Sequence, residues 1–178
     1  MVAKIKLNAK QLRQTNPTAE QLAKIKTNPI AFVLDNIIDT YNIGSFFRLG
    51  DALAIEKLYL CGRVVTPPNP KIHRASVGTW RWVAWEHYRE TETAIKKLKK
   101  AGWQIVAVEQ DKNSIDYRQF KPKFPVALIF GNETAGVSSP ILKQADVIVE
   151  LPLWGVNRSL NVFAAAAVVG YWVASFLS

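Results

Sequence analysis

Five short apolar runs, separated by helix-like segments, constrain the fold more than any other feature of this sequence. The runs are nearly continuous and rich in β-branched and aromatic residues, and they cover residues 30–34, 57–61, 103–109, 126–130 and 147–151. Strands of this kind are buried on both faces, as in a parallel sheet that has helices on each side. The sequence therefore predicts an α/β fold with a mostly parallel sheet and helices on both faces.

Helical patterns fill most of the intervals between these runs. We expect helices around residues 45–54, over 91–100 with Gly102 after the end, in a short piece from Ser138, and from about Ser159 to the C-terminus. Residues 62–79 hold three prolines and two glycines, which predicts a long loop. Residues 1–27 are expected to form a helical extension, with Thr18 as a helix cap, and residues 28–178 one domain.

Lysine and arginine outnumber aspartate and glutamate by 23 to 14, which gives a net charge of +9 and a pI near 9.7. That balance favours a polyanionic partner, either a nucleic acid or an acidic membrane surface. Cys61 is the one cysteine and His73 and His87 are the two histidines, so we expect no internal disulfide and no metal site. The interpretation of Cys61 is a small buried hydrophobic residue.

Residues 162–178 carry no charge. A helix that is apolar on all sides is either a membrane span or deeply buried. This segment is short and alanine-rich, so we expect burial between the core and a partner subunit, and no membrane. The first eight residues lack a continuous apolar stretch and do not form a secretory signal, which makes the cytoplasm the expected location.

Polar residues gather directly after three of the predicted strands. Ligands of parallel α/β sheets bind at the carboxyl ends of the strands, so the chemistry is expected there. After the first strand come Asn36, Asn42, Gly44 and Arg48, with Asn42 and Gly44 placed where a helix would begin. Arg48 lies one turn beyond Gly44, and a guanidinium there indicates a phosphate or carboxylate partner. The alternative is an ordinary helix cap, a turn glycine and an exposed arginine.

The other two polar segments follow the fourth and fifth runs. Residues 130–137 read FGNETAGV and place two glycines beside Glu133, a residue that could pair with Arg48. Residues 151–162 read LPLWGVNRSLNV, in which Ser159 is also an ordinary candidate for a helix cap. The sequence has neither a GxGxxG dinucleotide fingerprint after a strand nor a P-loop.

Together the three segments resemble the motifs of the SpoU/TrmH family of RNA ribose methyltransferases. The family pattern N-x5-N-x-G-x3-R matches from Asn36 to Arg48, FGxE-x2-G matches residues 130–136, and (I/L)P-hydrophobic-x-G-x3-SLN matches residues 151–161. The chain departs from the pattern at Leu153-Trp154, where a methionine and a small residue are commoner, and at Asn157 and Phe163.

The resemblance implies an S-adenosylmethionine-dependent enzyme that methylates a ribose 2′-hydroxyl in structured RNA. It also implies a homodimer and a C-terminal deep trefoil knot, which general folding rules would not suggest. Main-chain groups of Gly131, Leu151 and Leu160 would hold the cofactor, with Val108 and Glu109 as further candidates. The catalytic positions would be Asn42, Arg48, Glu133, Ser159 and Asn161.

The implied mechanism places Arg48 beside the reacting ribose. The family's usual proposal makes the arginine a general base, whereas a guanidinium that keeps its proton would hold a phosphate and stabilise the developing oxyanion. Asn42 would orient Arg48 or the ribose, and Glu133 would fix the guanidinium.

RNA contacts are expected from Arg48, Lys71 and Arg74, and the basic N-terminal segment is a candidate recruiting arm. Trp80, Trp82 and Trp85 alternate around Arg81, a spacing that suits the buried face of a strand better than base stacking. The modest N-terminal extension favours tRNA as the substrate. The alternatives are ribosomal RNA, and a non-catalytic RNA-binding protein on the same fold.

Overall fold

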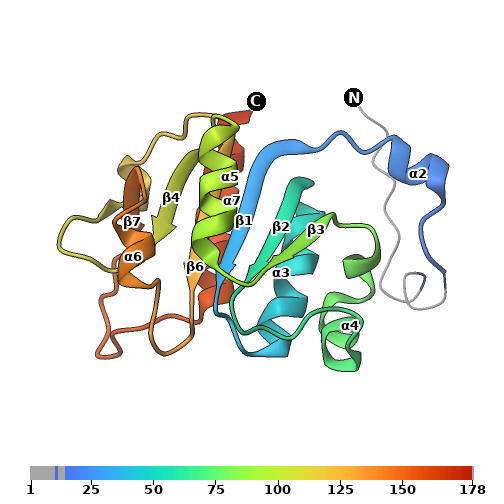
Figure 1. The fold of residues 1–178 in the computed structure, drawn as a ribbon, viewed down its shortest axis with the longest axis horizontal. Coiled ribbons are helices and arrows are strands. Elements are labelled where there is room, and N and C mark those ends of the chain that lie inside the picture. The colour runs from blue at the N-terminus through green and yellow to red at the C-terminus, as the bar shows by residue number, and fades with distance from the viewer. Residues whose placement is uncertain (1–10, 12–14, 178) are drawn as a thin grey trace.

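A computed structural model describes residue 11 and residues 15–177, and in this part of the chain seven strands form one fully parallel sheet (Figure 1). The strand order is β3-β2-β1-β6-β4-β7-β5. The strands are β1 (Asn28–Asp35), β2 (Ile55–Cys61), β3 (Trp85–Tyr88), β4 (Gln104–Val108), β5 (Ile115–Asp116), β6 (Val126–Gly131) and β7 (Val147–Glu150). The predicted α/β class with a parallel sheet is confirmed.

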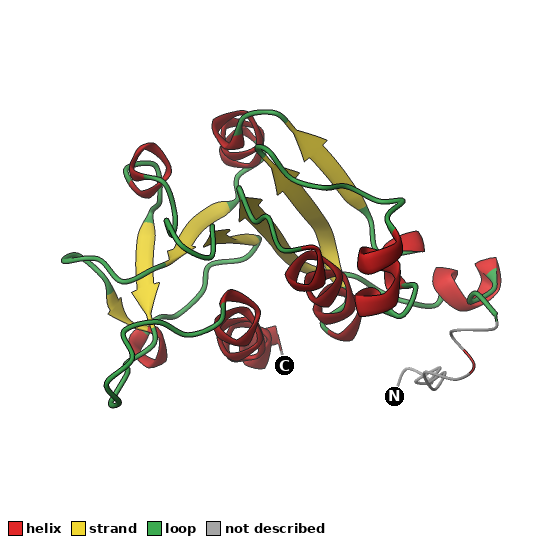
Figure 2. Cartoon of the chain, turned by 90° about the horizontal axis from the view of Figure 1, so that it is seen from below, coloured by secondary structure: helices red, strands yellow, loops and turns green. Residues whose placement is uncertain are grey.

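Helices cover both faces of the sheet (Figure 2). The helices are α2 (Ala19–Ala23), α3 (Thr40–Ala52), α4 (Pro70–Ser76), α5 (Thr91–Lys100), α6 (Ser139–Leu142) and α7 (Val162–Ala174), with 3-10 turns at Thr79–Arg81, Tyr117–Gln119 and Ser175–Leu177. Residues of α3 and α7 pack on one face, and residues of α5 and α6 pack on the other. The carboxyl ends of the strands lie at the lower edge of Figure 1.

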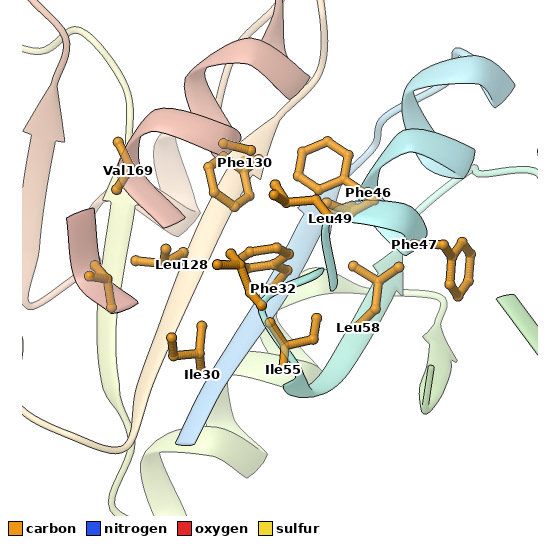
Figure 3. Packing of buried hydrophobic residues seen from close by; sticks show 14 of the residues in the cluster. Ile30, Phe32, Phe46, Phe47, Leu49, Ile55, Leu58, Leu128, Phe130 and Val169 are labelled. Carbon is orange, nitrogen blue, oxygen red and sulfur yellow. The ribbon is translucent and has the colours of Figure 1, made fainter. Parts of the chain in front are cut away.

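The larger part of the core lies under α3 and α7 and is built around aromatic rings (Figure 3). Phe32 of β1, Phe46 of α3 and Phe130 of β6 are fully buried, with ring centroids 5.2–6.1 Å apart. Phe32 meets both other rings edge to face, and such contacts stabilise a core beyond the area they bury. The cluster fixes α3 against β1 and β6, and these are the elements from which the polar loops emerge.

The predicted loop over residues 62–79 is wrong, because α4 and the start of a 3-10 turn lie within it. Asn69 caps α4 by accepting hydrogen bonds from the N–H groups of Lys71 and Ile72, and Pro70 is the first helical residue. An asparagine cap followed by proline is a standard helix start, and the prolines before it obscured the signal. The burial expected for Trp80, Trp82 and Trp85 is confirmed, since all three pack against the core, although only Trp85 lies in a strand.

Helix α3 starts five residues earlier than predicted. The carboxylate of Asp39 accepts a hydrogen bond from the N–H of Tyr41 and caps the helix, so Asn42 and Gly44 lie inside it. Gly44 is not a turn glycine: a Cβ there would lie 2.5 Å from the Cβ of Ala75 in α4. Gly44 is required because α3 and α4 pack with their backbones almost in contact.

The last helix starts at Val162 and not at Ser159. Asn161 is the cap, since its side-chain oxygen accepts hydrogen bonds from the N–H groups of Phe163 and Ala164. One face of α7 is buried in the core, while Val168 and Tyr171 are exposed. None of the helices in the described residues has both the length and the apolar character that a membrane span needs.

Thr18 caps α2 as predicted, in a reciprocal capping box with Gln21. The helix is short, however, and covers five residues. Most of the lysines of the proposed recruiting arm fall in residues 1–10 and 12–14, which lie outside the described residues.

Candidate active site

A cavity of about 590 Å³ opens at the carboxyl ends of β4, β6 and β7. This volume is in the range of sites that take small organic ligands or cofactors. Its walls come from three segments, namely the end of β4 at 108–110, the turn at 130–136 and the loop at 150–162. The ends of β6 and β7 are two of the three strand ends at which the sequence predicts the chemistry, and Val108 and Glu109 at the end of β4 were further candidates, whereas the predicted loop after β1 does not line the cavity.

A chain of side-chain hydrogen bonds joins this cavity to α3. Asn42 in the first turn of α3 donates through Nδ2 to the Glu133 carboxylate at 2.9 Å. Its Oδ1 accepts a hydrogen bond from Nδ2 of Asn161 at 3.2 Å. Asn42 is 7% exposed and has both ends of its amide occupied, so its orientation is fixed. Residues separated by 91 and 119 positions in the sequence therefore meet at one point.

Glu133 also holds the segment that leads into α3. Its two oxygens accept hydrogen bonds from the N–H groups of Ile38 at 3.2 Å and Asp39 at 3.1 Å. Burial by itself would raise the pKa of the Glu133 carboxyl, but the hydrogen bonds from Asn42, Ile38 and Asp39 outweigh it and lower the pKa below its ordinary value. A negative charge is thus maintained at the mouth of the cavity.

The turn that carries Glu133 is compact. The backbones of Asn132 and Gly136 exchange two hydrogen bonds, of 3.1 and 2.9 Å. A Cβ at Gly131 would lie 2.1 Å from the carbonyl carbon of Gly136, so no larger residue fits there. Gly136 has a φ of +69° and lies against the carboxylate of Glu109. Both glycines are required by the fold of the turn itself.

Six of the eight residues predicted for catalysis or cofactor binding line the cavity: Gly131, Glu133, Leu151, Ser159, Leu160 and Asn161. Asn42 is connected to them through Glu133 and Asn161. The hydroxyl and the N–H of Ser159 both donate to the side chain of Asn157, which shapes the loop ahead of α7.

Arg48 is not part of this hydrogen-bonded cluster. It is exposed on α3, and it takes part in none of the ion pairs among the described residues. The predicted pairing of Glu133 with Arg48 is therefore wrong in this structure. The physical reason is that the Glu133 carboxylate is already occupied by Asn42 and by the two N–H groups at the start of α3.

The predicted RNA-binding residues Lys71 and Arg74 are exposed on α4 and do not line the main cavity. Since Gly44 packs against α4, and Arg48 lies one helical turn beyond Gly44, Arg48 emerges on the α4 side of α3. Three cationic side chains thus share the surface formed by these two helices. The arrangement is compatible with a polyanion that crosses α4 to reach the cavity.

Sequence reasoning missed one polar residue that lines the cavity and one that is buried behind its wall, and it found a third only in part. Glu109, predicted only as a further candidate, lines the cavity, and its carboxylate accepts a hydrogen bond from the N–H of Val137 at 2.8 Å. Gln110 donates to the carbonyl of Arg158 at 3.0 Å and ties the 150–162 loop to β4. Asp35, at the end of β1, is buried. Their position after or at the end of a strand was the available signal.

The fold and the cavity define a class of protein: a parallel α/β domain with a cavity of small-ligand size between three strand-end segments, and with an amide and carboxylate cluster on one wall. Among the described residues, no group of three or more histidine, cysteine, aspartate or glutamate side chains could hold a metal ion. Comparison with known proteins narrows the class.

The chain belongs to the SpoU rRNA Methylase family, which it matches over residues 29–171. It is 29% identical over 153 residues to a tRNA (guanosine(18)-2′-O)-methyltransferase of Borreliella burgdorferi, covering 85% of this chain and 69% of the relative. It is 31% identical to the protein of the same name from Aquifex aeolicus, covering 85% and 71%. The predicted family and the predicted class of enzyme, an RNA methyltransferase, are confirmed.

The fold has solved counterparts. An rRNA methyltransferase from Sinorhizobium meliloti, crystallised with AdoMet bound, superimposes with a TM-score of 0.80 at 26% identity. The match covers 94% of this chain and 60% of that protein, so the relative is considerably longer.

Proposed function

We propose that this chain transfers the methyl group of S-adenosylmethionine to a ribose 2′-hydroxyl of structured RNA, and that tRNA is the substrate. The observation that carries the proposal is the hydrogen-bonded chain Asn161–Asn42–Glu133, because it joins the cavity to the helix that bears Arg48. The named function of the two tRNA methyltransferase relatives supports the choice of tRNA.

The cavity fits S-adenosylmethionine. Val108, Phe130, Val162 and Ala165 supply apolar surface for an adenine ring, and the carboxylate of Glu109 supplies acceptors for hydroxyl or ammonium groups. The predicted main-chain contributors, Gly131, Leu151 and Leu160, line the same walls. When bound, this cofactor supplies an electrophilic methyl group on a positively charged sulfur.

The residues of the chain then have to hold the RNA and stabilise charge. Arg48, free of carboxylate partners among the described residues, is available to bind the phosphate next to the target ribose and to stabilise the oxygen that loses its proton. Asn42 fixes the geometry between the cavity and α3 through Glu133 and Asn161. Positioning of this kind can supply a large part of the rate.

RNA would approach over α4, where Lys71 and Arg74 are exposed. Arg81 lies over the ring of Trp80, 5.7 Å from its centroid, and Trp80 donates to His73 of α4 at 3.2 Å. These groups extend the cationic surface away from the cavity, which suits a substrate much larger than a nucleotide. Replacement of Lys71 and Arg74 together by alanine should raise the KM for RNA and leave cofactor affinity unchanged.

Ribosomal RNA is the second candidate substrate. It is favoured by the structural match to the Sinorhizobium meliloti rRNA methyltransferase. Mapping of ribose methylations in a deletion strain and its parent separates the two: a missing methyl group in tRNA supports the proposal, and one missing in rRNA contradicts it.

A non-catalytic RNA-binding role is distinguished by measuring cofactor binding and methyl transfer to RNA. Purified protein is titrated with S-adenosylmethionine by calorimetry and incubated with total RNA and labelled cofactor. Binding together with label in alkali-resistant dinucleotides supports ribose methylation. RNA binding without either signal would refute it.

The same proposal includes a homodimer, a C-terminal trefoil knot and a cytoplasmic location. Exposed apolar side chains on and after α7, namely Val168, Tyr171 and Phe176, support a partner subunit on that helix. The chain passes from β6 over β4 to reach β7, a crossing that supports a knotted C-terminal segment. Light scattering tests the dimer, a crystallographic trace of residues 126–177 tests the knot, and fractionation tests the location.

A further inference from the structure

The carboxylate of Asp35 is buried where three segments of the chain meet. Asp35 is the last residue of β1 and is 1% exposed. Its Oδ1 accepts hydrogen bonds from the hydroxyl of Thr91 at 2.7 Å and from Nδ2 of Asn36 at 2.9 Å. Its Oδ2 accepts a hydrogen bond from the N–H of Ser138 at 3.0 Å. None of the ion pairs in the described part of the chain includes Asp35.

A buried carboxylate without a cation beside it is costly to keep, so its hydrogen bonds have to compensate. A stable core would be reached more simply with an apolar residue at this position. We therefore expect the acidic group at this position to hold its hydrogen-bond partners in place.

The partner with a functional consequence is Ser138. It ends the turn at 131–138 whose residues 131–136 line the cavity. The start of this turn is tied to the same place, because Nδ2 of Asn132 donates to the carbonyl of Asn36 at 2.8 Å. Asp35 itself pairs with Gly131 in the sheet register. Both ends of the turn are thus anchored at Asp35 and Asn36.

The turn between these anchors is internally closed by the backbone hydrogen bonds between Asn132 and Gly136. A closed turn moves as a unit, so its position relative to β4 and β7 depends on its ends. Displacement of Ser138 would shift the wall of the cavity and the carboxylate of Glu133 together.

We propose that Asp35 is a positioning residue for cofactor binding: its carboxylate fixes the exit of the 131–138 turn and so sets the width of the cavity. This role rests on the proposed function, since the cavity is taken to bind S-adenosylmethionine. Asp35 does not line the cavity and acts through the backbone of the turn.

Thr91 provides a matched control, because it donates to the other oxygen of the same carboxylate but belongs to α5. Thr91→Val removes one hydrogen bond of Asp35 and leaves the bond to Ser138. Asp35→Ala removes both of these bonds and also the bond from Asn36. If the carboxylate only stabilises the fold, the two variants differ in stability alone.

The test compares wild type, Asp35→Ala and Thr91→Val by calorimetric titration with S-adenosylmethionine and with S-adenosylhomocysteine. Loss of a charge-assisted bond at the turn should raise both dissociation constants about tenfold in Asp35→Ala. In Thr91→Val they should stay within about twofold of wild type. Amide hydrogen exchange at residues 132–138 should accelerate in Asp35→Ala only.

Ser138→Pro is a second route to the same loss if Asp35→Ala does not fold. It removes the N–H that binds Asp35 together with the hydroxyl, and it places the proline ring carbon against Oδ2 of Asp35, so the exit of the turn has to move away from the carboxylate. The φ of Ser138, −62°, is one that proline adopts. It too should weaken binding of both ligands about tenfold.

Wild-type cofactor affinity in either Asp35→Ala or Ser138→Pro, or an equal loss in Thr91→Val, would overturn the positioning role. These outcomes are separate from failure of the proposed function. A wild-type protein that binds S-adenosylmethionine but methylates no RNA would refute the function and leave the comparison of variants intact.

Discussion

Replacement of Glu133 by glutamine keeps the size of the side chain and removes its negative charge. Oε1 of Glu133 accepts hydrogen bonds from Asp39 and Asn42, and Oε2 accepts one from Ile38. Glutamine has one acceptor oxygen, so it can keep the first two bonds but would turn an NH2 group toward the N–H of Ile38. The variant therefore loses one hydrogen bond and the charge assistance of the others.

The expected cost is about 1 kcal/mol of unfolding free energy at pH 7, at the lower end for hydrogen bonds to a charged group, because the side chain is partly exposed to water. Activity should fall about tenfold, since Asn42 is held less firmly. Urea denaturation measures the first quantity and initial rates of methyl transfer to RNA measure the second.

The pH dependence makes the test specific. The pKa of Glu133 is lower in the folded protein than its ordinary value of 4.5, so its contribution is present above about pH 4.5 and is lost as the pH falls through the lowered value. The difference in stability between wild type and Glu133→Gln should therefore shrink from pH 7 to pH 3. Glu56→Gln, at an exposed position on β2, is the control for the loss of one carboxylate from the surface. A difference that is absent at pH 7, or equal at both pH values, would refute the reasoning.

Three further predictions follow from single contacts. Arg48→Ala should lower turnover more than about 100-fold with unchanged affinity for S-adenosylmethionine, and Arg48→Lys should not restore it because the planar fork is lost; wild-type rates in the alanine variant would contradict this role. Gly44→Ala should cost about 1–3 kcal/mol in urea denaturation because its Cβ would meet α4 at 2.5 Å, whereas Gly155→Ala, with open space around it, should cost little. Burial and the charge of Asp35 raise the pKa of the Cys61 thiol to about 12, so thiol reagents should label it only after unfolding, and rapid labelling of the native protein would count against this.

The sheet was predictable because a parallel strand that is buried on both faces has a continuous run of apolar residues. The five strands that were predicted are longer than three residues and lie in the interior. The two that were missed are β3, which contains Glu86 and His87, and β5, which has two residues. Edge strands of this kind have too few buried positions to show a pattern.

The helix starts were harder to predict, because several candidate caps compete in each polar loop. Asp39 and not Asn42 caps α3, and Asn161 and not Ser159 caps α7. The choice is made by packing, since the position of Phe46 in the core and the contact of Gly44 with α4 fix where α3 must begin. Local sequence does not contain that information.

Residue types at the site were predictable, whereas their pairing was not. Glu133 and Arg48 are the two charged residues at fixed positions of the motifs, and their opposite charges alone predict an ion pair. In the structure the Glu133 carboxylate accepts hydrogen bonds from Asn42 and from two backbone N–H groups ahead of α3. Backbone donors of this kind do not appear in a sequence motif, so these bonds could not be predicted.

This pairing bears on the role of Arg48 in the proposed reaction. A guanidinium keeps its proton in proteins, and no carboxylate in the described residues contacts Arg48. The side chain is then a cation whose five N–H donors can bind a phosphate and an oxyanion of the RNA. Because a protonated guanidinium has no acceptor, it cannot take the proton of the 2′-hydroxyl. The proton acceptor should come from the substrate phosphate or from solvent. We therefore expect replacement of the non-bridging oxygens of that phosphate by uncharged groups to slow single-turnover methyl transfer in the wild-type enzyme and, to a smaller extent, in Arg48→Ala, because the variant has already lost the contact with Arg48 but still needs the proton acceptor.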